Sequence, residues 1–380
     1  MARRKPKHIR VEEKKKMHIA LKITLIILAV IFLLILSLFL YINAKLDLIE
    51  YDDEIDKSVY DTVDLENGDS ILGEDELIED EEPDFDPETE VVEDIVDISG
   101  LEQVEEAPEI SEGEVITDSN VLNILLIGTD ERSNAFSTNA RSDSMILVSI
   151  DKSNGAVKLV SLERGMGVPV LEGQYAGQYD WLTHIFRYGG SDLLVKTVRT
   201  CFKVDLDKYV RVNFNSVKQV VDMIGGIDVY LTYAESEALN VVLPSNASTS
   251  TQPTLHEGMN HLDGGMALAY ARLRSIDSDW QRVQRQRNVI LAVVQTIKSS
   301  NLWQLDSLAN SVLPLVQTNL SKFEIAELIL YVPSFINSTF DQMTIPASGT
   351  YGGMTGMGGR GMFAPDFDLN SQILNEFLYG

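Results

Sequence analysis

Two strands joined by a turn are predicted by residues 145–162, which read MILVSIDKSNGAVKLVSL. Apolar residues dominate both halves, and Asn154-Gly155 between them is a strong hairpin signal because both residues tolerate the positive φ of a tight turn. A turn centred on this pair places Arg164 opposite residue 145, within two positions of Asp143. The sequence therefore predicts that Asp143 and Arg164 meet at the end of the hairpin away from its turn.

The segments around this hairpin alternate between strands and helices. A buried strand at 121–127 ends at Gly128-Thr129-Asp130, and further strands are predicted at 209–214 and 227–231. Apolar residues at helical spacing indicate helices at 191–201, 216–224, 263–272, 279–297, 302–317 and 322–331. Residues 234–253 have no regular pattern. This order predicts an α/β domain with three layers, α-β-α, and the antiparallel hairpin makes its central sheet mixed.

The charge of the chain is distributed in three blocks. The formal net charge is −27 over 380 residues. Residues 1–46 carry ten Lys and Arg against two Glu, residues 47–118 carry 31 Asp and Glu against one Lys, and the rest carry 20 basic and 25 acidic side chains. The acidic block would be repelled by phosphate backbones, so no nucleic acid is expected as a partner. Cys201 is the only cysteine, which excludes a disulfide framework and a cysteine-ligated zinc site.

A membrane anchor is predicted near the N-terminus. Residues 23–42 are 20 uncharged, mostly apolar residues that follow a basic stretch, and a helix of roughly 20 apolar residues crosses a bilayer core. The positive-inside bias places the N-terminus in the cytoplasm and the following residues outside the cell membrane, as in a single-pass protein. A cleaved signal peptide is the alternative, although its apolar region is normally about 7–15 residues long. The expected parts are a basic cytoplasmic tail (1–17), a signal anchor (18–42), a disordered acidic linker (43–119) and a folded domain (120–380).

The densest charged signal lies at 272–287, which holds five arginines in 16 residues. Ser278-x-x-Gln281 has the form of a capping box, so a helix is expected to start there. Near its N-terminus the helix then presents Arg282 and Arg285 on one face, with Gln286 on a neighbouring stripe, whereas Arg287 points away. Backbone N–H groups, the positive end of the helix dipole and guanidinium groups together make an anion site. A surface helix paired with acidic residues is the alternative.

Two acidic residues stand where predicted strands end or begin. Asp130 closes the strand at 121–127, and Asp143 precedes the strand at 145–150. Ligands bind at strand ends in α/β folds, and Mg²⁺ prefers one or two carboxylates together with phosphate oxygens. The pair therefore predicts Mg²⁺ held against a phosphate, unless both are turn or cap residues. His184 is open between a core hydrogen bond and a place in the site, and residues 356–361, which lack the Lys-Ser/Thr of a phosphate loop, are interpreted as a plain loop.

Seven motifs then occur in an order that characterises one family. They read IGTDER at 127–132, RSDS at 141–144, SLER at 161–164, LTH at 182–184 with YGG at 188–190, VDMIGGID at 221–228, LDG at 262–264 with ALAYAR at 267–272, and D-x-x-R-x-x-R-Q at 279–286. Together they resemble the LytR–CpsA–Psr family of bacterial cell-wall proteins, from about residue 120 to 300 and on towards Gly380.

The resemblance implies a phosphotransferase that acts outside the cytoplasm. Such enzymes take an anionic glycopolymer from an undecaprenyl-pyrophosphate carrier and attach it, through a phosphodiester, to a peptidoglycan hydroxyl. Two alternatives stay open: a polyprenyl-pyrophosphate phosphatase that uses the same site, and a non-catalytic regulator of the cell envelope. The polymer and the acceptor sugar are not specified by the sequence.

Matched position by position, the resemblance also implies the site residues. Mg²⁺ would be bound by Asp130 and Asp143, and catalytic roles fall on Asp130, Arg141 and Arg164. The implied pyrophosphate-binding residues are Arg164, Arg272, Arg274, Arg282, Arg285 and Gln286. The general base is left unassigned, because a metal-bound carboxylate is not easily a free base as well. The family usually has Pro-Arg-Asp where this chain has Glu163-Arg164-Gly165, so the acid after the arginine is missing and an acid precedes it.

Overall fold

The computed structural model describes residues 33, 36–52, 96–110, 113–131, 136, 140–246, 254–273, 276, 278–298, 302–336, 338 and 340–380. The chain divides into two compact units, Met1–Leu48 and Ile49–Gly380. In the first unit, residues 36–46 are helical. Among the described residues, no helix has the length and apolar character needed to span a membrane. The predicted cytoplasmic tail and most of the predicted anchor lie outside the described residues.

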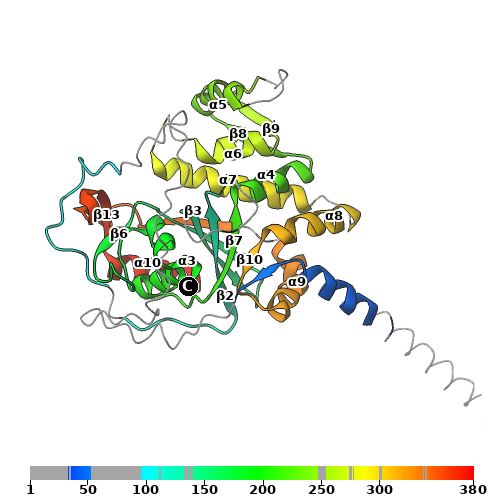
Figure 1. Ribbon diagram of the computed structural model, residues 1–380, viewed down its shortest axis with the longest axis horizontal. Coiled ribbons are helices and arrows are strands. Elements are labelled where there is room, and N and C mark those ends of the chain that lie inside the picture. Colours follow the sequence, from blue (N-terminus) through cyan, green and yellow to red (C-terminus); the bar gives the residue numbers. More distant parts are fainter. Residues whose placement is uncertain are drawn as a thin grey trace, which may run out of the picture. The chain divides into compact units, whose positions relative to one another are not determined.

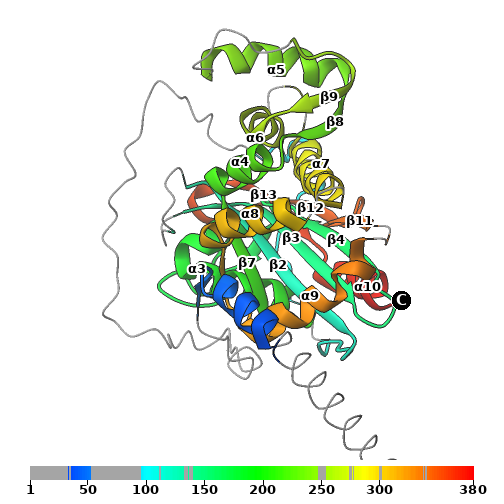
Figure 2. The same ribbon diagram turned by 90° about the vertical axis from the view of Figure 1, so that its right-hand side faces the viewer.

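The second unit is built on a seven-stranded sheet (Figures 1 and 2). In spatial order its strands are β1 (Glu50–Tyr51), β10 (Gln317–Thr318), β7 (Lys208–Asn213), β2 (Val121–Thr129), β3 (Ser142–Asp151), β4 (Val157–Leu162) and β11 (Phe340–Ile345). β3 is antiparallel to both β2 and β4, whereas β7 is parallel to β2 and β11 is parallel to β4. The predicted α/β domain with a central mixed sheet is therefore confirmed.

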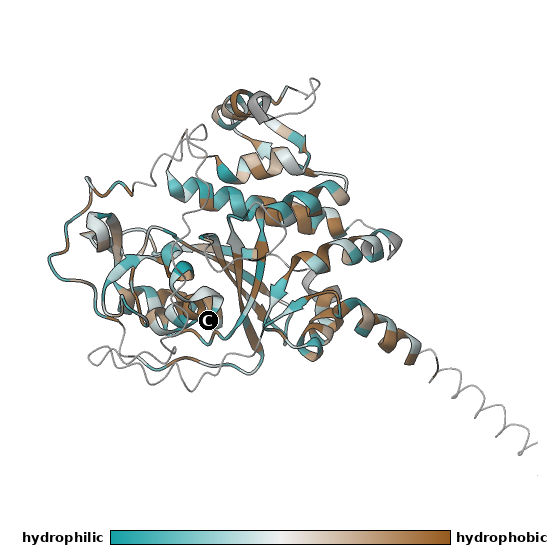
Figure 3. Cartoon of the chain, viewed as in Figure 1, coloured by the Kyte–Doolittle hydropathy of each residue, from teal (hydrophilic) through white to brown (hydrophobic). Residues whose placement is uncertain are grey.

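Alternate residues of the central strands face opposite layers of helices. Leu125 and Ile127 of β2 pack with α3 (Leu182–Phe202) and α10 (Phe367–Tyr379). On the other face, Ile124 packs with α9 (Lys322–Ile336), and Leu159 packs with α7 (Asp279–Lys298). The central strands therefore carry apolar residues on both faces, as strands covered on two sides must. Figure 3 colours the chain by the hydropathy of each residue.

A second, smaller core adjoins α7. It is formed by α4 (Phe214–Met223), β8 (Ile227–Leu231), α5 (Tyr233–Asn246), β9 (Gly258–Leu262) and α6 (Gly264–Arg272), with Val289 of α7 (Figure 2). The expectation of irregular structure at 234–253 is wrong, because α5 occupies its first part. The missed signal is a capping box: Thr232 N–H donates to the Glu235 carboxylate (2.9 Å), and Glu235 N–H donates to the Thr232 hydroxyl (3.3 Å).

The predicted hairpin is present as β3 and β4, but its register differs by two residues. Ile150 pairs with Val157, and Asp151 N–H donates to Ala156 O (3.0 Å), so four residues form the turn instead of two. Continued past the end of β4, this register places Arg164 opposite Asp143. The predicted meeting of these two residues is confirmed, and the corrected register brings them closer than the two-residue turn would.

Residues 96–104 run along a glycine-rich hairpin near the C-terminus. The hairpin consists of β12 (Tyr351–Thr355), the 3₁₀ turn η2 (Met357–Gly359) and β13 (Gly361–Pro365). Residues 356–360 are thus a connection, as the loop interpretation of 356–361 predicted, and Gly361 begins β13. Val104 N–H donates to Gly353 O (2.9 Å). A Cβ on Gly352 would lie 2.7 Å from Glu102 O, so the glycines of β12 allow the close approach.

The predicted disordered linker at 43–119 is wrong for its described residues. Besides the contact of residues 96–104 with β12, Glu50–Tyr51 forms the edge strand β1, and Tyr209 Oη donates to the Asp52 carboxylate. Tyr179 Oη likewise donates to Pro108 O. The edge of the sheet and the glycine-rich hairpin supply backbone hydrogen-bonding partners for this segment. Its charge density alone did not predict them. Residues 53–95 lie outside the described part of the chain.

Four further elements belong to the second unit. They are β5 (Gly167–Pro169), β6 (Tyr179–Trp181), α8 (Leu302–Val312) and the 3₁₀ turn η1 (Leu313–Leu315). The helix expected at 302–317 therefore ends early, where Pro314 enters the 3₁₀ turn.

Candidate active site

The end of β2 carries the first pair of predicted site residues. A β-bulge between Gly128 and Thr129 ends the regular pairing with β3, and bulges commonly redirect the chain beside functional sites. The Asp130 carboxylate accepts a hydrogen bond from Arg141 N–H (2.9 Å), and Arg141 Nε lies 3.6 Å from its second oxygen. Burial raises the pKa of Asp130; the Arg141 N–H opposes this effect, and the negative charge of Asp143 adds to it. The two predicted carboxylates therefore lie close enough to repel each other.

Arg164 connects the β3–β4 hairpin with α7. Its Nη1 lies 3.4 Å from Asp143 Oδ1, and its Nε donates to Asp279 Oδ2 (3.1 Å). Since the guanidinium group is buried between two carboxylates, its orientation is well defined. The side chain of Gln286, another predicted site residue, donates to Asp143 O (3.3 Å).

Asp279, the first residue of α7, binds two of the predicted arginines but was not among the predicted site residues. Its Oδ2 accepts hydrogen bonds from Arg164 Nε and from Arg282 Nη2, the latter at 3.0 Å. An acid in the first turn is stabilised by the helix dipole. Its three-residue spacing from Arg282 is the sequence signal that could have identified it. The helix begins at Asp279, as the capping pattern predicted.

Arg285 and Arg287 have partners on other elements. Arg285 Nη2 donates to Leu273 O (2.6 Å), and its Nη1 lies 3.4 Å from Glu235 Oε1. Arg287 Nη1 donates to Met343 O (2.9 Å) and to the Thr344 hydroxyl (2.8 Å) of β11. Arg287 thus points away from Arg285, as the helical wheel predicted. The pyrophosphate contact of Arg285 stays a prediction.

Arg272 lies at the same end of the sheet as Asp130. Its Cζ is 4.7 Å from the centre of the Phe214 ring. Phe214 follows Asn213, which pairs with Thr129 across β7 and β2, so Phe214 and Asp130 are neighbours in the extended register. Both α4 and α7 begin in this region, and helix N-termini attract anions. Arg274 lies outside the described residues.

Gly165 stands where the family pattern has an acid, and the structure leaves no room for a side chain there. A Cβ on Gly165 would lie 2.4 Å from Val96 Cγ2, so residue 96 occupies the space that an acid at position 165 would need. The preceding acid, Glu163, is fully buried.

His184 belongs to a hydrogen-bonded cluster around Asp180. The buried Asp180 carboxylate contacts His184 Nδ1 (3.0 Å), accepts a hydrogen bond from Tyr188 Oη (2.5 Å) and accepts two from Arg360 Nη2 (both 2.8 Å). Burial would raise the pKa of Asp180, but the hydrogen bonds from His184 and Tyr188 outweigh it and lower the pKa. Of the two interpretations of His184, the structure favours the core hydrogen bond.

Asp130 and Asp143 are the candidate ligands for a divalent cation. The mutual repulsion of Asp130 and Asp143 would be relieved by a bound metal, and two carboxylates with substrate oxygens suit Mg²⁺. Within the described ranges, no group of three or more His, Cys, Asp and Glu side chains could hold a metal by itself. A metal ion bound by Asp130 and Asp143 would therefore need further ligands, such as phosphate oxygens.

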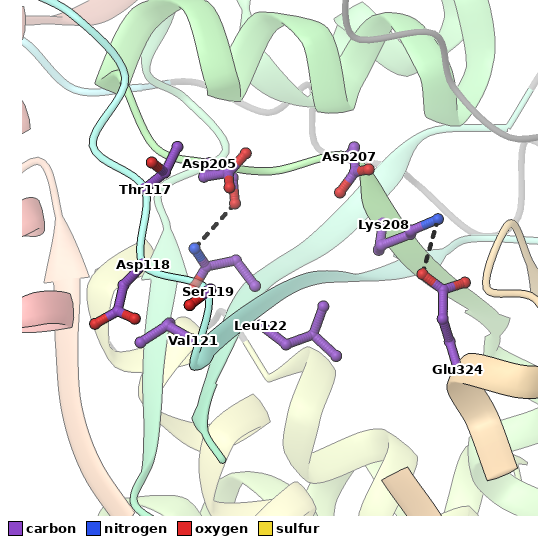
Figure 4. Close-up of a pocket in the computed structure, with 10 residues that line it drawn as sticks. Thr117, Asp118, Ser119, Val121, Leu122, Asp205, Asp207, Lys208 and Glu324 are labelled. Atoms are coloured by element: carbon purple, nitrogen blue, oxygen red, sulfur yellow. Dashed lines mark hydrogen bonds and ion pairs between the residues drawn. The ribbon is translucent and has the colours of Figure 1, made fainter. Parts of the chain in front are cut away.

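A separate cavity of about 340 Å³ lies where β2 and β7 begin, away from these residues (Figure 4). It is lined by Thr117, Asp118, Ser119, Val121, Leu122, Asn123, Asp205, Asp207, Lys208 and Glu324. Lys208 Nζ lies 3.1 Å from Glu324 Oε1 across it. Asp130 follows the last residue of the same β2 strand, so the cavity and the predicted site lie at opposite ends of the sheet.

Comparison with known proteins agrees with the motifs. Residues 92–374 match the LytR_cpsA_psr family. The chain belongs to this family. Among curated relatives, the polyisoprenyl-teichoic acid–peptidoglycan teichoic acid transferase TagV of Bacillus subtilis is 32% identical over 214 residues, which are 56% of this chain and 53% of TagV. TagU of Bacillus anthracis is 31% identical over 215 residues, which are 55% of this chain and 64% of TagU. The chain thus spans between half and two thirds of these two relatives.

Solved structures share the fold. The structure of TagT bound to LIIa-WTA is 26% identical, with a TM-score of 0.55, and the match covers 72% of this chain and 95% of TagT. The crystal structure of B. subtilis TagV is 27% identical, with a TM-score of 0.54, over 69% of this chain and 98% of that one. Both comparisons agree with an α/β domain around a mixed sheet.

Proposed function

We propose that this chain is a transferase that moves an anionic glycopolymer from a polyprenyl-pyrophosphate carrier to a hydroxyl group of peptidoglycan. The observation that carries the proposal is the linked cluster at one end of the sheet, in which Asp279 joins Arg164 and Arg282 beside Asp130 and Asp143. The names of the relatives, which are teichoic acid transferases acting on peptidoglycan, support the same reaction.

In the proposed reaction, the acceptor oxygen attacks the phosphorus that bears the glycopolymer. The bond from this phosphorus to the bridging oxygen breaks, polyprenyl phosphate leaves, and the hydroxyl proton is lost to a base that is not assigned. Such reactions depend mainly on positioning and charge neutralisation. Arg164 and Arg282 would bind the pyrophosphate, together with the predicted contacts Arg272, Arg274, Arg285 and Gln286. Arg141, paired with Asp130, would assist at the reacting phosphate.

Mg²⁺ is the proposed cofactor. Asp130 and Asp143 would hold it, and when bound it would neutralise charge on the phosphate oxygens. Arg141 lies beside Asp130 and Arg164 lies beside Asp143, so each proposed metal ligand has a positive charge next to it.

The proposed location follows from the sequence. Residues 18–42 would anchor the chain in the cytoplasmic membrane, and the residues that follow would lie outside it, near lipid-linked substrates. External protease applied to cells without a wall should cleave within the acidic residues between the anchor and the folded domain. Complete protection of that segment would contradict this topology.

Incubation of the chain with a lipid-linked glycopolymer, with and without peptidoglycan oligomers, tests the activity. Attachment of the polymer to the oligomers, dependent on Mg²⁺ and on Arg282, is the expected result. Release of free polymer phosphate at the same rate in both reactions would identify a phosphatase instead. Absence of turnover together with tight donor binding would identify a regulator.

A further inference from the structure

Glu163 is a fully buried acid that leaves one oxygen without a donor. It follows β4 and has no exposed surface. Its Oε1 accepts a weak hydrogen bond from Gly165 N–H (3.4 Å). Among the described residues, no donor lies within hydrogen-bond distance of its buried Oε2. An ionised carboxylate in this position would be strongly disfavoured, because burial without donors penalises the charged form.

The charged and titratable groups that face Glu163 come from two packed elements. From α7, the Asp279 carboxylate lies within hydrogen-bonding range, and Arg282 contributes a positive charge. From β12, Tyr351 faces the same region, and burial is the main cause that raises its pKa. On its own segment, Arg164 follows directly and binds Asp279.

An aromatic cluster covers this region. The ring of Trp280 on α7 lies 5.4 Å from that of Tyr351 and 5.6 Å from that of Phe363, measured between centroids. Aromatic side chains exclude water and keep the local dielectric constant low, which strengthens the repulsion between two neighbouring carboxylates.

Of the two carboxyl groups of Glu163 and Asp279, we expect that of Glu163 to carry the proton. Asp279 accepts hydrogen bonds from two arginines, which favour its ionised form. The only hydrogen bond that Glu163 accepts among the described residues is the weak one from Gly165 N–H. Burial, the hydrogen bond with Asp279 and the Asp279 charge, in that order, raise the pKa of Glu163 well above its ordinary value of 4.5.

We propose that Glu163 is a positioning residue: it stays protonated at neutral pH and donates a hydrogen bond to Asp279, which holds that carboxylate as the shared acceptor of Arg164 and Arg282. The consequence for catalysis rests on the proposed function, in which these two arginines bind the pyrophosphate.

The first test measures the proton directly. Infrared spectra of the full 380-residue chain at pH 7 should contain the C=O stretch of a protonated carboxylic acid. Glu163→Gln should remove that band, whereas the matched variant Glu324→Gln should not, because hydrogen bonds from Ser321 lower the pKa of Glu324. A wild-type spectrum without such a band overturns the proposal. The wild-type band can also be titrated with pH, which decides the question even if the variants fail to fold.

The second test measures positioning. An amide at 163 keeps an N–H donor, so Glu163→Gln should bind inorganic pyrophosphate, measured by calorimetry, within about threefold of wild type, whereas Glu163→Ala should lose about tenfold. Above the raised pKa, wild-type binding should weaken and that of Glu163→Gln should not. Equal losses in the Gln and Ala variants would overturn the proposal. If wild type transferred no polymer, the proposed function would fail, while the spectra and pyrophosphate binding would still decide the role of Glu163.

Discussion

Arg282 and Arg285 lie one turn apart on α7 and are equally buried, with 1% of each residue exposed, yet their surroundings differ. Arg282 shares Asp279 with Arg164, which also contacts a predicted metal ligand. Arg285 instead binds Leu273 O and Glu235 in the second core. Burial and charge alone therefore do not identify a substrate-binding arginine. We propose that the identity of its partner does, and four predictions test this proposal.

The largest effect is expected for Arg287→Ala. This side chain donates hydrogen bonds to Met343 O, the Thr344 hydroxyl and the Gln284 side chain. Loss of three hydrogen bonds at about 1 kcal/mol each lowers the free energy of unfolding by about 3 kcal/mol. Denaturant unfolding measures this change, and transfer per folded molecule should stay at the wild-type level. If the Arg287→Ala protein were stably folded but transferred no polymer, Arg287 would instead be assigned to the active site.

Arg282→Ala should mainly affect the reaction. A charge-assisted hydrogen bond contributes roughly 1.5–3 kcal/mol, so loss of one to the pyrophosphate slows transfer about tenfold to hundredfold. Arg282→Lys should recover part of the rate, because the ammonium keeps the charge but not the bidentate geometry. Transfer rates are compared with melting temperatures for both variants. Wild-type transfer by a stably folded Arg282→Ala protein would exclude this arginine from the site.

A smaller effect is expected for Arg285→Lys. Lysine keeps the charge near Glu235 but cannot also reach Leu273 O with a second nitrogen, so the free energy of unfolding should fall by about 1 kcal/mol. The transfer rate of the folded protein should change less than in Arg282→Lys. The reverse order of the two lysine variants would favour the predicted pyrophosphate contact of Arg285.

The smallest effect is expected from Mg²⁺ on thermal stability. In the folded protein the pKa of Asp130 is raised above its ordinary value of 3.8. The free energy of unfolding therefore falls as the pH rises from 3.8 through the raised pKa, because the folded protein must then release the proton. A bound cation offsets this cost, so Mg²⁺ at twice its dissociation constant should add about 0.6 kcal/mol at neutral pH and little at acidic pH.

Asp130→Asn and Asp143→Asn should abolish the Mg²⁺ effect. Asp207→Asn, in the cavity of Figure 4, is the matched control and should retain it. Equal Mg²⁺ stabilisation in all three variants would place the cation elsewhere.

Local features of the sequence predicted much of the fold. Apolar runs located β2, β3 and β4, and the capping pattern at Ser278 located the start of α7. Where local signals were misread, a specific residue explains the error: the turn at Asn154 is longer than a two-residue hairpin turn, and the capping box at Thr232 was missed. The acidic linker was misjudged because its described residues pair with backbone groups of distant strands.

The sequence by itself determined the family, the strand ends that carry Asp130 and Asp143, and the approach of Arg164 to Asp143, because turns, caps and periodicity act over a few residues. Only the tertiary structure decided which partner each arginine has. Glu235 is 50 residues from Arg285, and Met343 is 56 residues from Arg287. The partner of a buried charge is chosen by the packing of separate elements, and the same packing places Glu163 against Asp279. No local pattern contains that information.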